Sequence, residues 1–180
     1  MSRAPAARDL ACVAMQIGRP PRPLRRVAAR CPWGAPAVVE DLPYDGAGRP
    51  FPTLFWATCP SLVAAVSAVE DAGGVKRFEA LLRGDVRLLE SLRAATRYER
   101  RRRRRLAIEC EAPPSDGGAS LVTGIAGVAR TTTLKCLHAH AAHALARPGY
   151  LLGQRILEAA APVFAAQGCC TPGWERDEAS

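Results

Sequence analysis

The residues best suited to chemistry lie in one short window, residues 135–143, in the last third of the chain. All three histidines of the protein fall in this window, together with one of its seven cysteines and a lysine. Thiolate sulfur and imidazole nitrogen are zinc ligands, and the same two groups form catalytic thiol sites. The window therefore indicates metal binding, thiol chemistry or a histidine cluster with a structural role.

A helix through this window places three of its side chains on one face. At about 100° per residue, Cys136, His140 and His143 fall within an arc of about 60°, and His138 points to the other side. The sequence thus predicts a zinc site with Cys136, His140 and His143 as ligands, completed by Cys59 or His138. A fourth protein ligand would make the site structural, and a water molecule would leave it open for hydrolysis.

Thiol chemistry is the second interpretation of the same residues. If Thr133 caps the helix, Cys136 lies in its first turn, where the helix dipole stabilises a thiolate. Lys135 adds positive charge, and His140 is one turn away as a base. Neither interpretation names a substrate or a reaction, so whether the protein is an enzyme stays open.

Arginine is the second unusual feature of the sequence. The chain has 25 Lys and Arg residues and a net charge of +8, yet only Lys76 and Lys135 are lysines. A non-enzymatic module that binds a polyanion, either nucleic acid or polyphosphate, is therefore the alternative function. A solvated basic helix end is the plainer explanation of the long arginine run. The candidate polyanion contacts are Arg19 and Arg22 in a proline-rich loop and the run Arg100, Arg101, Arg102, Arg103, Arg104 and Arg105.

The elements that must position these residues follow from hydrophobic spacing and turn signals. The predicted fold is α+β, with a small N-terminal β-sheet or hairpin packed by a mostly helical C-terminal part. A short helix is expected over residues 8–17, and strands over 24–30, 37–40 and 51–58. Helices follow over residues 60–73, 75–84 and 85–106, then a flexible loop at 111–120 and two more helices ending near 147 and 161.

The chain is expected to be one domain over residues 8–170, between a disordered leader at 1–7 and a loose tail at 171–180. No run of residues is long and apolar enough for a transmembrane helix, and we find no signal peptide. A cytoplasmic location follows as an expectation, with cysteines that are reduced, reactive or metal-bound. Protein partners are not predicted.

Three segments of the chain are similar to a known family. They are the loop at residues 18–22, the run at 50–60 that contains Pro52, Trp56 and Cys59, and the segment from 128 to 143. Through them the chain resembles the actinobacterial family of uncharacterised proteins called domain of unknown function five-zero-one, over residues 8–170. The resemblance implies no particular activity. Within the histidine window it matches Cys136, His138 and His143 rather than the three residues on the helical arc.

Overall fold

The fold combines a small sheet with six α-helices, as seen in a computed structural model that describes residues 5–21, 23–130 and 132–174. The sheet is antiparallel, with strand order β1 (Leu24–Arg30), β2 (Pro36–Asp41) and β3 (Phe55–Ala57). Every residue of the central strand β2 is buried. The expected α+β class is confirmed, although the strand predicted over residues 51–58 shortens to three residues.

The helices are α1 (Ala7–Ile17), α2 (Pro60–Asp71), α3 (Gly74–Gly84), α4 (Val86–Leu106), α5 (Leu137–Ala146) and α6 (Leu151–Ala159). Single 3-10 turns occur at Ala107–Glu109, Ala119–Val122 and Ile125–Gly127. None of the helices in the described part of the chain has the length and apolar character needed to cross a bilayer.

Local signals account for the starts of α2 and α4. Pro60 occupies the first turn of α2, where its missing N–H costs nothing. Asp85 caps α4, accepting hydrogen bonds from the backbone N–H groups of Arg87 and Leu88. Both helices therefore begin where the sequence predicted.

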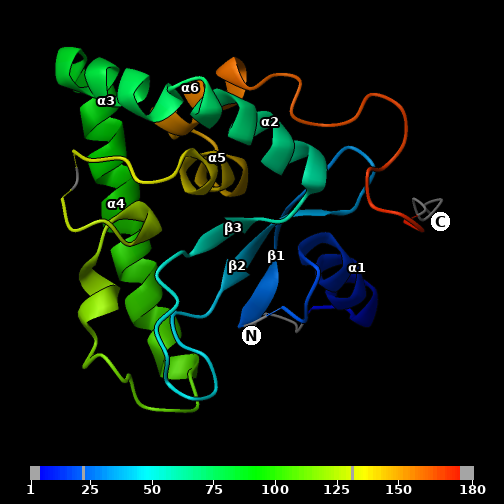
Figure 1. Ribbon diagram of the computed structural model, residues 1–180. Coiled ribbons are helices and arrows are strands. Elements are labelled where there is room, and N and C mark those ends of the chain that lie inside the picture. Colours follow the sequence, from blue (N-terminus) through cyan, green and yellow to red (C-terminus); the bar gives the residue numbers. More distant parts are fainter. Residues whose placement is uncertain (1–4, 22, 131, 175–180) are drawn as a thin grey trace.

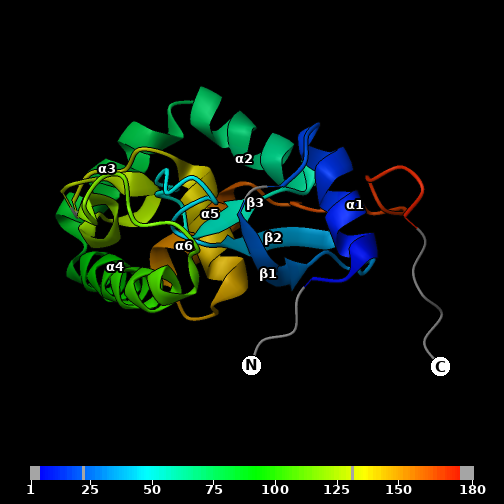
Figure 2. The same cartoon turned by 90° about the horizontal axis from the view of Figure 1, so that it is seen from below.

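Helix α5 lies in the middle of the molecule, between the sheet and α4, with α2 and α6 beside it (Figure 1). The view from below shows the same order, with α4 at one end and α1 at the other (Figure 2). Seven of the ten residues of α5 are buried, four of them alanines. Small side chains let neighbouring elements approach its backbone closely, so the histidine window forms part of the core.

The carboxyl-terminal segment differs in part from the expected loose tail. Thr171 is 3% exposed, and its hydroxyl accepts a hydrogen bond from Gln16 of α1. The indole N–H of Trp174 donates to the carbonyl of Trp33 at 3.0 Å. Thr171 and Trp174 therefore contact the domain, Pro172 and Gly173 between them are exposed, and the rest of the predicted tail lies outside the described residues.

The contact between α5 and α6 depends on Gly153. A Cβ at this position would lie 2.5 Å from the carbonyl oxygen of His140 and 2.7 Å from the Cβ of Ala144. Gly153→Ala is expected to lower the free energy of unfolding by about 1–3 kcal/mol, because the two helices must move apart. Urea unfolding followed by circular dichroism measures the change.

Gly84 is the matched control, since it is also helical but a Cβ there meets nothing within 4 Å. Gly84→Ala should leave stability unchanged or raise it slightly, because alanine has the higher helix propensity. Equal destabilisation by both substitutions would contradict close packing as the cause.

Candidate metal centre

Three side chains from two helices meet at the start of α5: Glu70 from α2, and Cys136 and His138. Their ligand atoms all lie within 4.8 Å of one another. The Nδ1 atom of His138 lies 3.6 Å from the sulfur of Cys136 and 3.3 Å from Oε1 of Glu70. All three residues are partly exposed, so the group is open to solvent and to small ligands.

The geometry arises because α5 starts later than the sequence suggested. Cys136 is extended, with φ −153° and ψ 120°, and precedes the first helical residue, Leu137. The Leu137 N–H donates to the Glu70 carboxylate, which takes the place of a local cap. The predicted helix start near Thr133 is therefore wrong, and Cys136 is free to turn towards His138.

Hydrogen bonds on the far side of His138 define its ring. Nε2 lies 3.1 Å from the carbonyl oxygen of Val63 and 3.2 Å from the hydroxyl of Ser67. A carbonyl can only accept, so Nε2 carries a hydrogen and Nδ1 faces Cys136 and Glu70. The pKa of His138 is raised to about 9, first by its hydrogen bond with Cys136 and then by the charge of that residue, the Val63 carbonyl and Glu70, while burial opposes the rise.

The other two histidines of the window point into the core. His143 Nδ1 lies 2.8 Å from Oε1 of Glu99, and His140 Nδ1 lies 2.7 Å from the hydroxyl of Tyr150. Neither histidine can bind the same ion as Cys136. Cys136 lies before the helix, so it is not on one helical face with His140 and His143. The grouping of Cys136, His140 and His143 is thus not what the structure brings together.

Cys59, the other expected ligand, also lies elsewhere. It occupies the N-cap position of α2 without a side-chain capping hydrogen bond, and its sulfur is 3.5 Å from that of Cys170. Burial raises the pKa of the Cys59 thiol to about 12, with a smaller contribution from Cys170, so it stays protonated at neutral pH. Glu70 replaces it in the group. No local pattern marked Glu70, because its role depends on the contact between α2 and α5.

The predicted polyanion contacts are dispersed. Arg103 is completely buried, and Arg102 forms two hydrogen bonds with the buried carboxylate of Glu40. Arg100 donates to the carbonyl of Thr123. Arg101, Arg104 and Arg105 are exposed. The run therefore divides between interior contacts and solvent, as expected when consecutive residues of a helix point in all directions.

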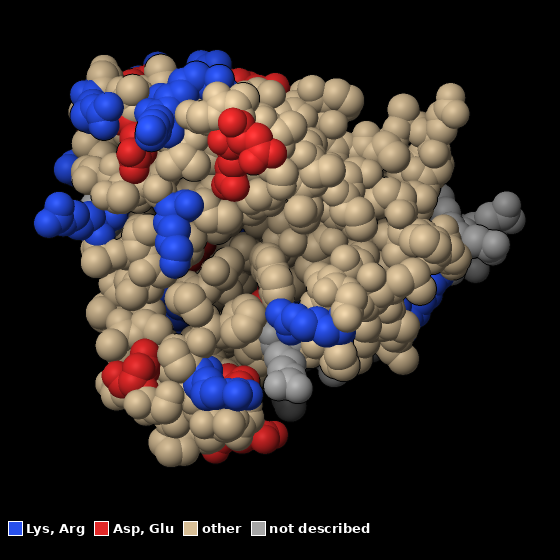
Figure 3. All heavy atoms as spheres, viewed as in Figure 1, with Lys and Arg blue, Asp and Glu red and all other residues tan. Residues whose placement is uncertain are grey.

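In the proline-rich loop, the guanidinium of Arg19 lies 5.2 Å from the centre of the Trp56 ring, and Arg22 lies outside the described residues. Charged side chains on one face of the molecule gather over α3 and α4, and the remaining surface of that face is mostly uncharged (Figure 3). The basic surface is therefore uneven, and it does not centre on the arginine run alone.

A cavity of about 400 Å³ lies beside the metal-type group. Cys136 and His138 line it, together with Lys135, Thr53 and Trp56. The strand β3 and the start of α5 thus form its walls. A ligand in this cavity would meet both an aromatic surface and the sulfur and nitrogen atoms of the group.

Comparison with known proteins gives one match. The model of a family described as "Protein of unknown function (DUF501)" matches residues 27–158. No curated protein and no solved structure matches the chain. The match covers β2, β3, most of β1, α2 to α5 and nearly all of α6, and hence every residue of the metal-type group.

Proposed function

Because the chain belongs to the DUF501 family, whose description assigns no activity, we propose a function from the site itself. The protein binds a zinc ion through Cys136, His138 and Glu70. Sulfur, imidazole nitrogen and carboxylate oxygen are all zinc ligands. The proximity of these three atoms in one partly exposed group is the observation that carries the proposal.

The distances within the group support tetrahedral coordination. Zinc bonds of about 2.3 Å to sulfur and about 2.0–2.1 Å to nitrogen or oxygen place neighbouring ligand atoms about 3.4–3.6 Å apart at tetrahedral angles. The distances from His138 Nδ1 are 3.6 Å to the Cys136 sulfur and 3.3 Å to the Glu70 oxygen. These two distances match tetrahedral coordination of one ion, and the third pair of ligand atoms, the Cys136 sulfur and the Glu70 oxygen, lies within 4.8 Å.

The surroundings also support ligation through His138 Nδ1. Metal-bound histidines usually donate their other ring N–H to a carbonyl or carboxylate, which orients the ring. Here Nε2 faces the Val63 carbonyl at 3.1 Å. The Leu137 N–H likewise donates to the Glu70 carboxylate and holds it at the N-terminus of α5. Both outer contacts are backbone groups, so they are independent of the ligands themselves.

Three protein ligands leave a fourth coordination position for water or substrate, as in catalytic zinc sites. A bound zinc ion would supply Lewis acidity and lower the pKa of that water. The cavity lined by Trp56, Cys136 and His138 is where a substrate would meet the site. Parts of both long segments behind the family resemblance, residues 50–60 and 128–143, line this cavity, which supports a shared role for them.

Zinc content is the direct test. Protein purified without metal-affinity steps, stripped with a chelator and then titrated with zinc is expected to bind about one ion per chain, as measured by mass spectrometry of the metal. Cys136→Ser and His138→Gln should each abolish stoichiometric binding. Cobalt substitution should produce a thiolate charge-transfer band that Cys136→Ser removes.

Cys110→Ser is the matched control, because Cys110 is partly exposed like Cys136, but among the described residues its thiol hydrogen-bonds only to the carbonyls of Tyr44 and Leu106. It should leave zinc binding unchanged. A stable wild-type protein that binds no zinc would contradict the proposal. So would zinc binding that survives Cys136→Ser and is lost in Cys59→Ser.

A reactive thiol is the second candidate function, favoured by the position of Cys136 at the N-terminus of α5, 3.6 Å from His138 Nδ1. The helix dipole and an imidazolium both stabilise a thiolate. Under this alternative, metal-free protein reacts with iodoacetamide faster at Cys136 than at Cys110, and His138→Gln removes the difference. Equal rates at the two cysteines would exclude it.

A further inference from the structure

A second site is built around the buried pair Glu99 and His143, on the opposite side of α5 from the zinc ligands. Oε1 of Glu99 accepts a hydrogen bond from His143 Nδ1 at 2.8 Å, and Oε2 accepts one from Arg103 at 2.9 Å. His143 is 2% exposed. Among the described residues no protein group bonds its other ring nitrogen, Nε2. A buried pair thus holds an imidazole with one nitrogen unused.

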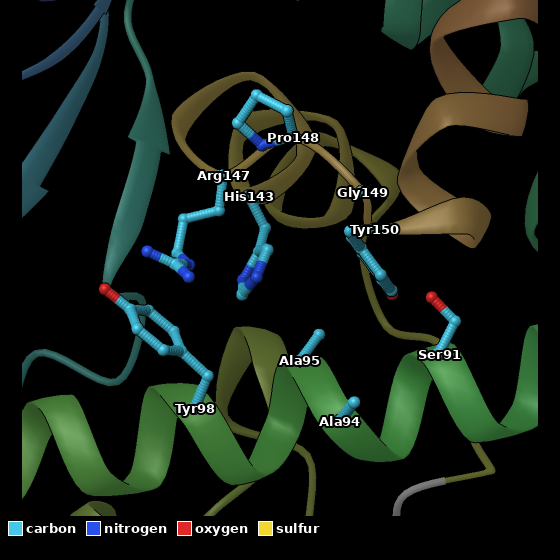
Figure 4. Close-up of a pocket in the computed structure, with 9 residues that line it drawn as sticks. All are labelled: Ser91, Ala94, Ala95, Tyr98, His143, Arg147, Pro148, Gly149 and Tyr150. Atoms are coloured by element: carbon cyan, nitrogen blue, oxygen red, sulfur yellow. The ribbon is translucent and has the colours of Figure 1, made fainter.

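His143 lines a cavity of about 170 Å³ between α4 and the loop that precedes α6. Tyr98, Arg147 and Tyr150 line the same cavity; Arg147 and Tyr98 lie together on one side of His143, and Tyr150 lies on the other (Figure 4). The Arg147 guanidinium lies 4.0 Å from the centre of the Tyr98 ring. Stacking on an aromatic ring leaves the N–H edge of a guanidinium available to a ligand.

An adjoining hollow of about 690 Å³ shares Ser91, Ala94 and Gly149 with this cavity. Its walls include Arg87, Arg93 and Arg97 of α4, of which Arg93 and Arg97 are about one turn apart, and a single acid, Glu90. Within the described chain, none of these three arginines nor Arg147 has a carboxylate within ion-pair distance. We call the two hollows together the α4–α6 groove. It carries four arginines that form no ion pair with a described residue.

The hydroxyl of Ser91 adds a neutral donor. It accepts a hydrogen bond from the Leu151 N–H at 2.9 Å, so its own hydrogen is directed elsewhere. Ser91 lines both hollows of the α4–α6 groove. The groove therefore has guanidinium and imidazole groups at one end of its inner part and a hydroxyl group at the other, and no carboxylate is among the described residues that line this part.

We propose that the α4–α6 groove binds a phosphate group. The inner cavity is of a size for one such group, beside Arg147 and His143. The Arg147 guanidinium donates to the phosphate oxygens, and His143 Nε2, whose ring donates through Nδ1 to Glu99, accepts a hydrogen bond from a protonated phosphate oxygen. Guanidinium groups match the geometry of phosphate oxygens and form charge-assisted hydrogen bonds with them. Arg93 and Arg97 in the outer hollow neutralise further negative charge, so a ligand with a second or third phosphate gains contacts there.

The test is calorimetric titration of the full chain with inorganic phosphate, pyrophosphate and tripolyphosphate at constant ionic strength. Arg147→Ala is expected to weaken binding of all three by about tenfold or more, since a hydrogen bond to a charged group contributes about 1.5–3 kcal/mol. The double variant Arg93→Ala/Arg97→Ala should weaken binding of the two longer ions and spare inorganic phosphate. A ligand that carries one phosphate is thereby distinguished from one that carries several.

Arg104→Ala is the matched control, because Arg104 is an exposed arginine of the same helix outside the groove. It should change none of the three affinities. His143→Gln should weaken binding as Arg147→Ala does. His143 is buried, so its substitution can impair folding; Arg147 is exposed, so Arg147→Ala tests the site without that problem. Equal losses in Arg104→Ala and Arg147→Ala would show general attraction to a basic surface and overturn the site, as would absence of binding by all three ions.

Discussion

Arg103→Met is expected to lower the free energy of unfolding by about 3–5 kcal/mol. Arg103 is completely buried, and its guanidinium donates to the carbonyls of Ser120, Thr123 and Gly124 and to the carboxylate of Glu99. Without the guanidinium, Glu99 keeps only His143 as a partner for a buried charge. Each of the three carbonyls loses one of its donors at the same time and keeps another, such as Arg100 at the Thr123 carbonyl. Urea unfolding at neutral pH measures the loss.

Two further variants separate charge from volume. Arg104→Met changes the neighbouring exposed arginine in the same way and should shift stability by no more than about 0.5 kcal/mol. Glu99→Gln/Arg103→Met removes both charges, so it should be more stable than Arg103→Met alone. If Arg103→Met cost less than about 1 kcal/mol, the ion pair would not be a structural element of the core.

Acidification should destabilise the protein through His140. The pKa of His140 is lowered from 6.5 to about 4, first by complete burial, with a smaller effect from His143, while Glu99 opposes the shift. Its Nε2 is buried without a partner among the described residues. The unfolded state therefore binds the proton between about pH 6.5 and 4, and the folded state does not.

The protein therefore loses stability as the pH falls, because protons stabilise the unfolded state. A depressed pKa contributes stability that is present above pH 6.5 and is lost as the pH falls towards 4. About 2–3 kcal/mol should be lost by pH 4.5, since one pKa unit corresponds to about 1.4 kcal/mol. The measurement is the free energy of unfolding in urea, from pH 7.5 to 4.5, for the wild type and for His140→Asn. The difference in this free energy between the two proteins should shrink as the pH falls.

His138→Asn, studied in the presence of a chelator, is the matched control. The pKa of His138 is shifted in the opposite direction, to about 9, so this residue does not add to the loss of stability in acid. A wild-type curve that stays parallel to that of His140→Asn down to pH 4.5 would contradict a neutral, buried His140.

Much of the helical part of the fold follows from local signals. The spacing of apolar residues predicted Val86, Leu89 and Leu92 as the inward face of α4, and of these Leu92 is buried, whereas Val86 is 65% exposed. Pro60 and Asp85 begin α2 and α4, as predicted. These signals act within one or two turns of the chain. The sequence could not predict that Arg103, in the middle of six arginines, is buried. That depends on Glu99 and on carbonyls of the loop at residues 120–124.

The opening window shows the same division. Its composition of one cysteine and three histidines is enough to predict chemistry at residues 135–143. Spacing on an ideal helix then selected Cys136, His140 and His143, because it assumed that the helix begins before Cys136. In the structure the carboxylate of Glu70 caps α5 at Leu137 instead. A cap provided by another helix leaves no trace in the local sequence.

The sequence by itself thus determined the class of fold, the family, and the stretch of chain that carries sulfur and imidazole. Only the tertiary structure decided how that stretch divides. Cys136 and His138 face outward with Glu70 at the start of α5, and His140 and His143 enter the core beside Tyr150 and Glu99. The physical reason is that each partner comes from another element, so its position depends on packing and not on spacing along the chain.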